Sequence, residues 1–155
     1  MFLSSAKSRT NESELKRKIG QLFMIGIPDN SLPDEYLELC EKYYIGNFTL
    51  NANNCISLSE LCDTLSTLRK KTYNTTKLYQ FVEVDQEGGW VTRIYEGSAM
   101  ISGAMSFAAS GADEAKMKKE GAKIGRILRA LGCNADTAPV LDVNINPDNP
   151  IIGTR

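Results

Sequence analysis

The amino-acid sequence predicts an α/β fold built around a parallel sheet. Four short apolar or β-branched runs alternate along the chain with segments of helical periodicity, and a helical segment precedes the first run. Alternation of this kind favours parallel strands that are joined by right-handed helical crossovers. The 155 residues are 42% hydrophobic and 24% charged, which is the balance of an ordinary soluble domain and excludes disordered, collagen-like and coiled-coil chains.

The N-terminal third is expected to contain two helices and two short strands. Asn11, followed three residues later by a glutamate, resembles a capping box and predicts the start of the first helix. The apolar run that follows is closed by Gly26 and Pro28, as expected of a buried strand. Pro33 opens a second helix, and Gly46 ends it before a short strand. These elements are predicted over residues 11–19, 21–27, 31–46 and 47–50, after a frayed or disordered N-terminus at residues 1–10.

The central third contains the clearest helix of the sequence. Ser57 begins a capping box, and leucines follow on one helical face to about Lys71. The β-branched and aromatic run over residues 78–84 predicts a strand that is buried on both faces. Residues 86–112 are glycine-rich and have little periodicity, so they predict a long connection of the kind that is commonly functional or mobile.

The last helix is expected over residues 114–131, between an Asp113 cap and a terminal Gly132. Its basic residues are expected to form a solvated face, and Gly121 and Gly125 are expected to let the helix lie close to the sheet. The apolar residues expected to face the core are Met117, Ile124, Ile127, Leu128 and Leu131.

Polar residues gather where the predicted strands end. The last strand is expected over residues 133–138, and residues 139–155 form its polar exit loop. Since ligands of parallel α/β folds bind at the C-terminal ends of the strands, the site is expected there.

Charge, histidine and cysteine content narrow the possible functions. The chain has 18 Lys and Arg against 19 Asp and Glu, so nucleic acid and anionic membranes are not expected as partners. It has no histidine, which excludes the commonest general base and any metal site containing histidine. The sequence has neither an 18-residue apolar run nor a secretory signal, so the expected location is cytoplasmic. The four cysteines, expected to be reduced and mostly buried thiols, are Cys40, Cys55, Cys62 and Cys133.

The strongest candidate site follows the third predicted strand. Asp85 and Glu87 share one face of an extended segment and lie ~6–7 Å apart along the chain, which is compatible with a pair of glycosidase carboxylates. The alternative is that one carboxylate pairs with Arg93 while the other caps a helix or faces water. The adjacent Gly88-Gly89 pair permits a tight turn that would aim Asp85 and Arg93 into one pocket.

Trp90 and the run from Asp142 are two further features of these loops. Trp90 is expected either to stack on the apolar face of a sugar or to anchor the loop as a partly buried side chain. The run from Asp142 resembles the opening of a calcium loop, but Pro147 stands where such a loop needs glycine and Gly153 where it needs glutamate. We therefore expect no metal and no cofactor, and we interpret this run as a hydrogen-bonded loop in which Asp142 supports the site from behind.

Five segments, taken together, carry a family resemblance. The segments are residues 18–26 (KIGQLFMIG), 84–93 (VDQEGGWVTR), 130–134 (ALGCN), 138–143 (APVLDV) and 151–155 (IIGTR). They resemble the N-terminal part of glycoside hydrolase family 3, and specifically its β-N-acetylhexosaminidase branch, which the D-Q-E-G-G-x-V-x-R pattern marks. The resemblance covers essentially the whole chain after residue 10.

This resemblance implies a (β/α)₈ TIM barrel, of which residues 11–155 would form the N-terminal half with about four βα units. It also implies retaining hydrolysis of β-linked N-acetylglucosamine through a covalent intermediate. Asp85 matches the family aspartate that holds sugar hydroxyls, and Arg93 and Arg155 match arginines of the same subsite. On this basis Glu87 is a supporting residue, and Asp85 and Glu87 are not the catalytic pair.

The chain departs from the family in what it lacks. The family's Lys-His-Phe-Pro-Gly-His-Gly segment, its loop histidine and its nucleophilic aspartate all lie downstream of the motif that ends at Arg155, so no catalytic residue is expected here. Asn47, Thr49 and Asn51 also replace apolar residues of the family pattern. The alternatives are a non-catalytic carbohydrate-binding module, or an interaction remnant that self-associates through exposed strand edges.

Overall fold

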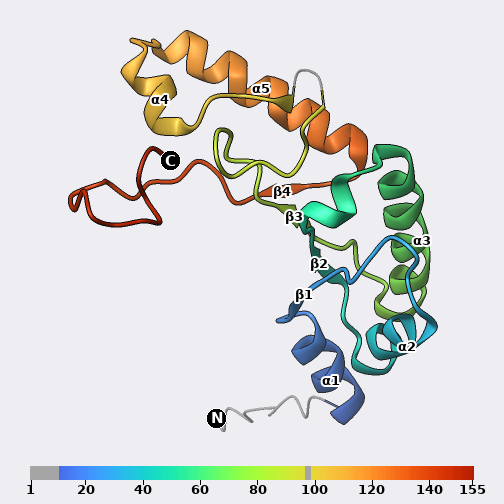
Figure 1. Ribbon diagram of the computed structural model, residues 1–155. Coiled ribbons are helices and arrows are strands. Elements are labelled where there is room, and N and C mark those ends of the chain that lie inside the picture. Colours follow the sequence, from blue (N-terminus) through green and yellow to red (C-terminus); the bar gives the residue numbers. More distant parts are fainter. Residues whose placement is uncertain (1–10, 97–98) are drawn as a thin grey trace, which may run out of the picture.

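The computed structural model describes residues 11–96 and 99–155, so the expectation for residues 1–10 falls outside the described residues. Within these residues a four-stranded sheet has the order β1-β2-β3-β4, and every neighbouring pair is parallel, which confirms the predicted topology (Figure 1). The strands are β1 (Met24–Gly26), β2 (Asn47–Thr49), β3 (Val82–Val84) and β4 (Ala135–Asp136). The helices are α1 (Glu12–Gly20), α2 (Asp34–Tyr43), the 3₁₀ turn η1 (Ala52–Cys55), α3 (Leu58–Thr76), α4 (Ala104–Ala109) and α5 (Glu114–Leu131).

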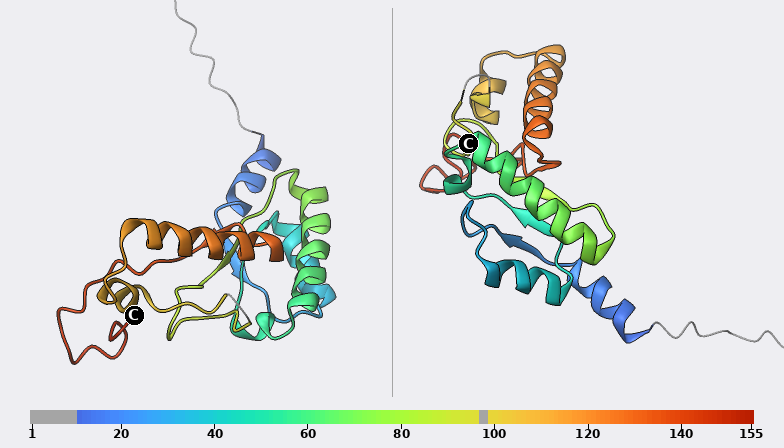
Figure 2. Two further views of the ribbon diagram at one scale, coloured as in Figure 1. Left: turned by 90° about the horizontal axis from the view of Figure 1, so that it is seen from above. Right: turned by 90° about the vertical axis from the view of Figure 1, so that its right-hand side faces the viewer.

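One face of the sheet packs against helices. Helices α2 and α3 lie side by side along it, and the C-terminal half of α5 joins them over β4 (Figures 1 and 2). Phe48 and Val82 are register partners on this face, and neither side chain is exposed. Burial of such apolar side chains stabilises the fold by about 1.5–3 kcal/mol each. We call this helix-covered side the outer face.

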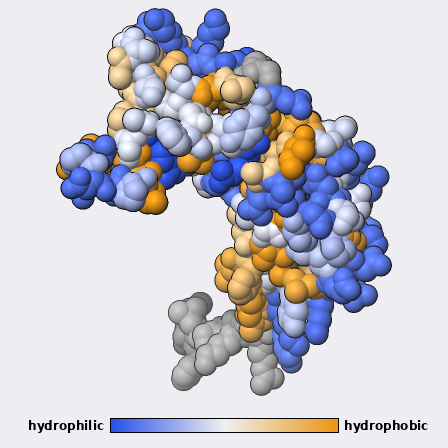
Figure 3. All heavy atoms as spheres, in the orientation of Figure 1, coloured by the Kyte–Doolittle hydropathy of each residue, from blue (hydrophilic) through white to orange (hydrophobic). Residues whose placement is uncertain are grey.

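The opposite face, called here the inner face, is curved and open. Its strand residues include the register partners Thr49 and Glu83, and Phe81 on the same face is 58% exposed. Apolar surface is visible at the lower end of the molecule in Figure 3. Just before β1 in the chain, Leu22 and Phe23 are 84% and 55% exposed. Strand β3 is shorter than the predicted residues 78–84, and its residues Val82, Glu83 and Val84 are buried on both faces, as predicted.

Asn47 explains why β2 forms despite its polar residues. Its Nδ2 donates to the carbonyls of Gln21 at 2.9 Å and Phe23 at 3.4 Å, and its Oδ1 accepts from the Phe81 N–H at 3.1 Å. One amide thus connects the beginnings of three strands. Asn134 connects β4 to β3 in the same way, since its side chain bonds the backbone of Val82 and Gln80 at 2.8 Å each.

Two helix ends differ from their predictions. Helix α3 continues to Thr76 instead of ending near Lys71, because Thr72 and Thr76 are buried and return hydrogen bonds to carbonyls one turn earlier. Helix α2 ends at Tyr43, and the capping residue Tyr44 adopts a left-handed conformation (φ 56°) before Gly46 is reached. Neither ending carries a glycine signal in the sequence.

Helix α5 has the predicted bounds, but only part of it packs as predicted. Ile124 and Leu128 are buried, whereas Met117 is 45% exposed because the N-terminal half of the helix extends past the sheet (Figure 1). The expected close approach at Gly121 and Gly125 is wrong, since a Cβ at either position would meet no atom within 4 Å.

The four cysteines are free thiols, and Cys40, Cys55 and Cys133 are buried as expected. Among the described residues, no helix is long and apolar enough to cross a membrane.

Candidate functional site

The C-terminal end of β3 positions the first two candidate residues. Asp85 directly follows the strand, and its Oδ2 accepts from Arg93 Nη2 at 2.8 Å. The two side chains are 39% and 27% exposed, so the pair is open to solvent on one side. Both Asp85 and Glu83 lie on the inner face, two residues apart along the chain. The structure therefore brings Asp85 and Arg93 together at the expected edge of the sheet.

A tight turn makes this pairing possible. The N–H groups of Glu87 and Gly88 both donate to the Val91 carbonyl, at 3.0 and 3.1 Å. Gly88 and Gly89 have positive φ values of 86° and 59°, and a Cβ on Gly88 would lie 2.5 Å from the Ser102 carbonyl oxygen. The turn expected from the glycine pair is present, and only glycine fits its first position.

Gln86 fixes the loop that follows, and sequence reasoning missed it. The side chain is 1% exposed, and its Nε2 donates to the carbonyls of Ile94 and Ala99 at 3.1 and 2.9 Å. Its Oε1 accepts from the N–H groups of Arg93 and Ile94 at 2.9 and 3.0 Å. The available signal was strand alternation, because Gln86 falls on the same face as buried Val84 and must therefore satisfy its amide inside the protein.

Glu87 has a partner of its own. Its Oε2 accepts from Arg155 Nε at 3.0 Å, and a second contact joins its Oε1 to Arg155 Nη2. The Glu87 side chain is 7% exposed. The expectation that the second carboxylate would cap a helix or face water is wrong, because each of the two carboxylates pairs with a different arginine.

Arg155 is held in place by this pair and by its backbone. The Met105 N–H donates to the Arg155 carbonyl at 3.1 Å. The hydrogen bond to Glu87 raises the pKa of the guanidinium, desolvation opposes this, and the charges of Glu87, Asp142 and Asp85 raise it further. Asp142 is exposed and acts on Arg155 through its charge. Arg155 thus pairs with Glu87, and its guanidinium is also stabilised by the charges of Asp142 and Asp85.

Thr137 links the two strand ends and was also missed. Its hydroxyl donates to Glu83 Oε1 at 2.7 Å and lies in hydrogen-bond contact with Asp85 Oδ1. Because a hydroxyl carries one proton, it donates to one of these carboxylates at a time. Asp85 is consequently fixed from two sides, by Thr137 at Oδ1 and by Arg93 at Oδ2.

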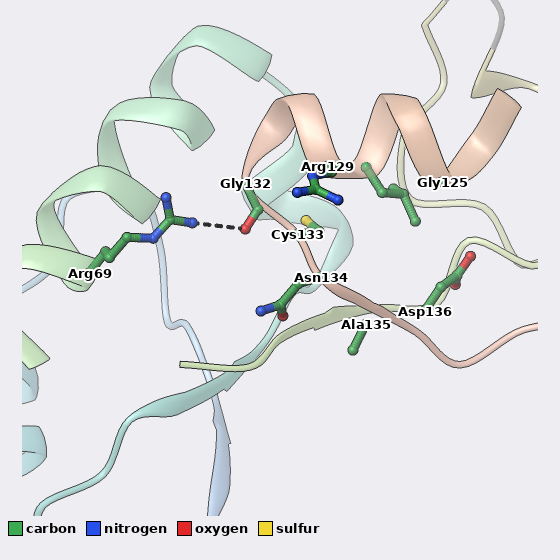
Figure 4. Close-up of a pocket in the computed structure, with 9 residues that line it drawn as sticks. Arg69, Gly125, Arg129, Gly132, Cys133, Asn134, Ala135 and Asp136 are labelled. Atoms are coloured by element: carbon green, nitrogen blue, oxygen red, sulfur yellow. Dashed lines mark hydrogen bonds between the residues drawn. The ribbon is translucent and has the colours of Figure 1, made fainter. Parts of the chain in front are cut away.

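Asp136 lies on the outer face, in a groove of about 610 Å³ beneath α5 (Figure 4). Desolvation raises the pKa of this carboxyl to about 6, and the charges of Glu83, Asp85 and Glu87 add to the rise. A hydrogen bond from the Gln86 N–H, 3.0 Å long, acts in the opposite direction. The groove lies behind the sheet, so Asp136 belongs to the support of the site and not to its open side.

Trp90 is exposed, and the loop after β4 is held by its own hydrogen bonds. Trp90 is 84% exposed, so the partly buried anchor is wrong and its ring is free to contact a ligand. The loop is hydrogen-bonded as expected: Asn146 Oδ1 accepts from the Asp148 N–H at 3.0 Å, and Asn149 Oδ1 accepts from the Ile151 N–H at 2.8 Å. Within the described residues no group of three or more Cys, Asp or Glu side chains could hold a metal ion.

Known proteins are similar to this chain in sequence and in fold. The family model for the glycosyl hydrolase family 3 N terminal domain matches residues 14–155. The chain belongs to glycosyl hydrolase family 3. The resemblance noted in the sequence is thereby confirmed.

Relatives in the family carry hexosaminidase names. The chain is 35% identical over 129 residues to Beta-hexosaminidase A of Pseudoalteromonas piscicida, covering 81% of this chain and 22% of that protein. It is 30% identical over 149 residues to the Beta-N-acetylglucosaminidase/beta-glucosidase of Cellulomonas fimi, covering 95% of this chain and 25% of that protein. This family 3 chain therefore spans about a quarter of the length of these relatives.

Solved structures agree with the fold. A family 3 β-N-acetylglucosaminidase from Paenibacillus sp. superposes with a TM-score of 0.82 at 33% identity, over 90% of this chain and 26% of that one. A β-N-acetylhexosaminidase from Beutenbergia cavernae gives a TM-score of 0.74 at 26% identity, over 90% of this chain and 43% of that one. The four parallel strands and their helices are thus part of a TIM-barrel-type fold, as predicted.

Proposed function

We propose that residues 11–155 form the N-terminal half of a family 3 β-N-acetylhexosaminidase barrel and supply part of its N-acetylglucosamine subsite. Asp85 accepts hydrogen bonds from sugar hydroxyls, Arg93 and Arg155 line the same subsite, and Trp90 stacks on the sugar ring. The observation that carries this proposal is the half-exposed Asp85–Arg93 pair at the C-terminal end of β3. Both Asp85 oxygens are fixed by protein donors, yet the carboxylate keeps lone pairs toward solvent.

Glu87 and Asp142 have supporting roles in this proposal. The Glu87 carboxylate is almost fully buried against Arg155, so it orients that guanidinium and does not reach substrate itself. Asp142 adds negative charge beside the same arginine. Each arginine of the subsite is therefore paired with a carboxylate, which leaves no unpaired positive charge and suits an uncharged sugar.

Substitution of Asp85 tests the binding role. Asp85→Ala should leave the chain folded and weaken binding of N-acetylglucosamine by about 1–3 kcal/mol, the usual loss for a hydrogen bond to a charged group. Binding is measured by NMR titration of the 155-residue chain, and folding by circular dichroism. The matched control is Asp63→Ala on exposed α3 surface, which should bind like the parent. Unchanged binding in a folded Asp85 variant would remove this residue from the subsite.

The 155-residue chain alone is expected not to hydrolyse a chromogenic β-N-acetylglucosaminide. The chain contains no histidine. Asp85 and Glu87 lie on one short segment, and each is paired with an arginine. Retaining hydrolysis needs two catalytic groups on opposite sides of the sugar. Turnover by purified chain is the measurement, with an Asp85→Ala, Glu87→Ala double variant as the contamination control. Activity that vanishes in the double variant would contradict the proposal.

A second candidate is an interaction module, which the open edges of the sheet favour. In the described sheet β1 and β4 each have one strand neighbour, and apolar side chains follow β4 in exposed positions. Leu141, Val143 and Ile145 are 86%, 74% and 89% exposed. Self-association through these edges predicts a molar mass that rises with concentration in sedimentation equilibrium, and a constant monomer mass would dismiss this candidate. A cytoplasmic location is part of the main proposal, and the four free thiols support it.

A further inference from the structure

Two buried glutamines flank strand β3, and they differ in how their side chains are bonded. Gln80 lies two residues before the strand and Gln86 two residues after it, and they are 4% and 1% exposed. Gln80 Oε1 accepts from the Thr72 hydroxyl at 3.1 Å, and Gln80 Nε2 has no partner among the described residues. The Gln86 side chain makes four hydrogen bonds to backbone groups of residues 93–99. The glutamine at the site end of β3 is therefore the fully bonded one.

The Gln86 amide uses its whole hydrogen-bonding capacity. A carboxamide has two N–H donors and two acceptor lone pairs. Its donors bond the carbonyls of Ile94 and Ala99, and its oxygen accepts from the N–H groups of Arg93 and Ile94. An ionised glutamate could accept but not donate here, and a lysine could donate but not accept. This position therefore depends on the bonds of a glutamine and not on its volume.

Two neighbouring residues hold the two ends of Arg93. Gln86 Oε1 accepts from the Arg93 backbone N–H at 2.9 Å, and Asp85 Oδ2 accepts from Arg93 Nη2 at 2.8 Å. Because successive residues of an extended segment point to opposite faces, Asp85 and Gln86 bond Arg93 from opposite sides. A long side chain that is fixed at both ends is ordered when the protein folds, so a ligand does not have to order it again.

We propose that Gln86 is a positioning residue of the N-acetylglucosamine subsite and acts through Arg93. This inference rests on the proposed function and deepens it. Gln86 is buried behind the subsite and fixes the backbone from which the Arg93 guanidinium reaches Asp85. The Asp85–Arg93 pair is thereby preorganised before the sugar arrives. Without the Gln86 amide, the Arg93 side chain has to be ordered when sugar binds, which weakens binding.

A double-mutant cycle on the 155-residue chain tests this role. NMR titrations give the dissociation constant for N-acetylglucosamine in the parent, in Gln86→Ala, in Arg93→Ala and in the double variant. Gln86→Ala should weaken binding about two- to tenfold, the range expected for ordering one long side chain. In the Arg93→Ala background the same substitution should change the constant by less than about twofold, because the residue through which it acts is absent.

Two further variants separate positioning from a general loss of stability, which urea unfolding measures. Gln80→Ala removes the other buried glutamine, at the far end of β3, and should lower the free energy of unfolding without changing the sugar constant. Gln86→Glu keeps an acceptor for the Arg93 N–H and loses the donors, so it should be destabilised and yet bind sugar more tightly than Gln86→Ala. Gln86→Asn, whose shorter amide stays polar, takes the place of Gln86→Ala in the cycle if that variant does not fold.

The outcomes separate the two proposals. Binding that is unchanged in folded Gln86→Ala, or that is weakened equally with and without Arg93, overturns the positioning role while sugar binding by the parent still supports the subsite. A loss of binding in Gln80→Ala as large as that in Gln86→Ala assigns the effect to stability and also overturns it. Failure of the parent to bind N-acetylglucosamine overturns the proposed function and the positioning role with it.

Discussion

On the outer face of the sheet the register partners Phe48 and Val82 are both fully buried under helices, whereas on the inner face the partners Thr49 and Glu83 are polar. The outer face is stabilised by removal of apolar surface from water, which depends little on exact neighbours. On the inner face Glu83 is bonded by Thr137, which lies more than fifty residues later in the chain. Stability on that face depends on single hydrogen bonds between distant residues.

The largest predicted effect is on the outer face. Phe48→Ala should cost about 3–5 kcal/mol, because the ring is 0% exposed and packs 6.4 Å from the Tyr36 ring, centroid to centroid. Phe81→Ala on the inner face, where the ring is 58% exposed, is the matched control and should cost below about 1 kcal/mol. Urea unfolding measures both. Equal losses would mean that the two faces are not distinguished by burial.

Thr137→Val should have the next largest effect, about 1.5–3 kcal/mol, because it removes the hydroxyl donor of the buried Glu83 carboxylate. It should also weaken N-acetylglucosamine binding, since Asp85 Oδ1 loses its contact. Thr137→Ser retains the hydroxyl and should recover most of both losses. A valine variant as stable as the serine variant would show that shape, and not the hydroxyl, matters at this position.

Asp136 is the polar exception on the outer face, where it is the register partner of Val84. Its pKa is raised from 3.8 to about 6 in the folded chain, so the folded state binds the proton more tightly than the unfolded state. Stability is therefore lost as the pH rises through this interval. Asp136→Asn should gain about 1–2 kcal/mol at pH 7 and little at pH 4, after allowance for partial solvent screening. The control is Asp148→Asn at an exposed position. A gain in stability for Asp136→Asn that is the same at pH 7 and pH 4 would contradict the raised pKa of Asp136.

The smallest effect is expected at the beginning of the strands. Asn47→Ala should cost about 1 kcal/mol, since water can reach some of the backbone groups that its amide bonds. The measurable signature is faster hydrogen exchange at the Phe81 N–H, which donates to Asn47 in the parent chain. An exchange rate at the Phe81 N–H equal to that of the parent chain would show that the Asn47 side chain does not protect this amide.

The sequence was sufficient to predict the helices and core residues of the outer face, but it did not predict the hydrogen bonds of the inner face. Apolar periodicity and caps located α5 within its observed bounds and placed Ile124 and Leu128 in the core. They could not show that Met117 lies beyond the sheet, because periodicity reports a helical face and not what covers it. Helix α4 was missed because its six residues lie in a glycine-rich connection and are too few to establish a period.

For the candidate site, motif spacing located Asp85, Arg93 and the turn between them, since glycines report backbone conformation directly. It did not identify Thr137 or the pairing of Glu87 with Arg155. Those contacts join residues 52 to 68 positions apart, and a sequence pattern carries no measure of such distances.

Gln86 should protect the amides of an irregular loop from hydrogen exchange as strongly as those of a core strand are protected. The N–H groups of Arg93 and Ile94 both donate to its buried side-chain oxygen. An amide hydrogen exchanges only when its bond opens, and here opening requires an almost fully buried side chain to leave its place. The Arg93 and Ile94 amides should therefore exchange as slowly as the amides of β3, over about minutes to hours. Exposed loop amides should exchange faster. The segment that presents Arg93 is in this kinetic sense an extension of the sheet.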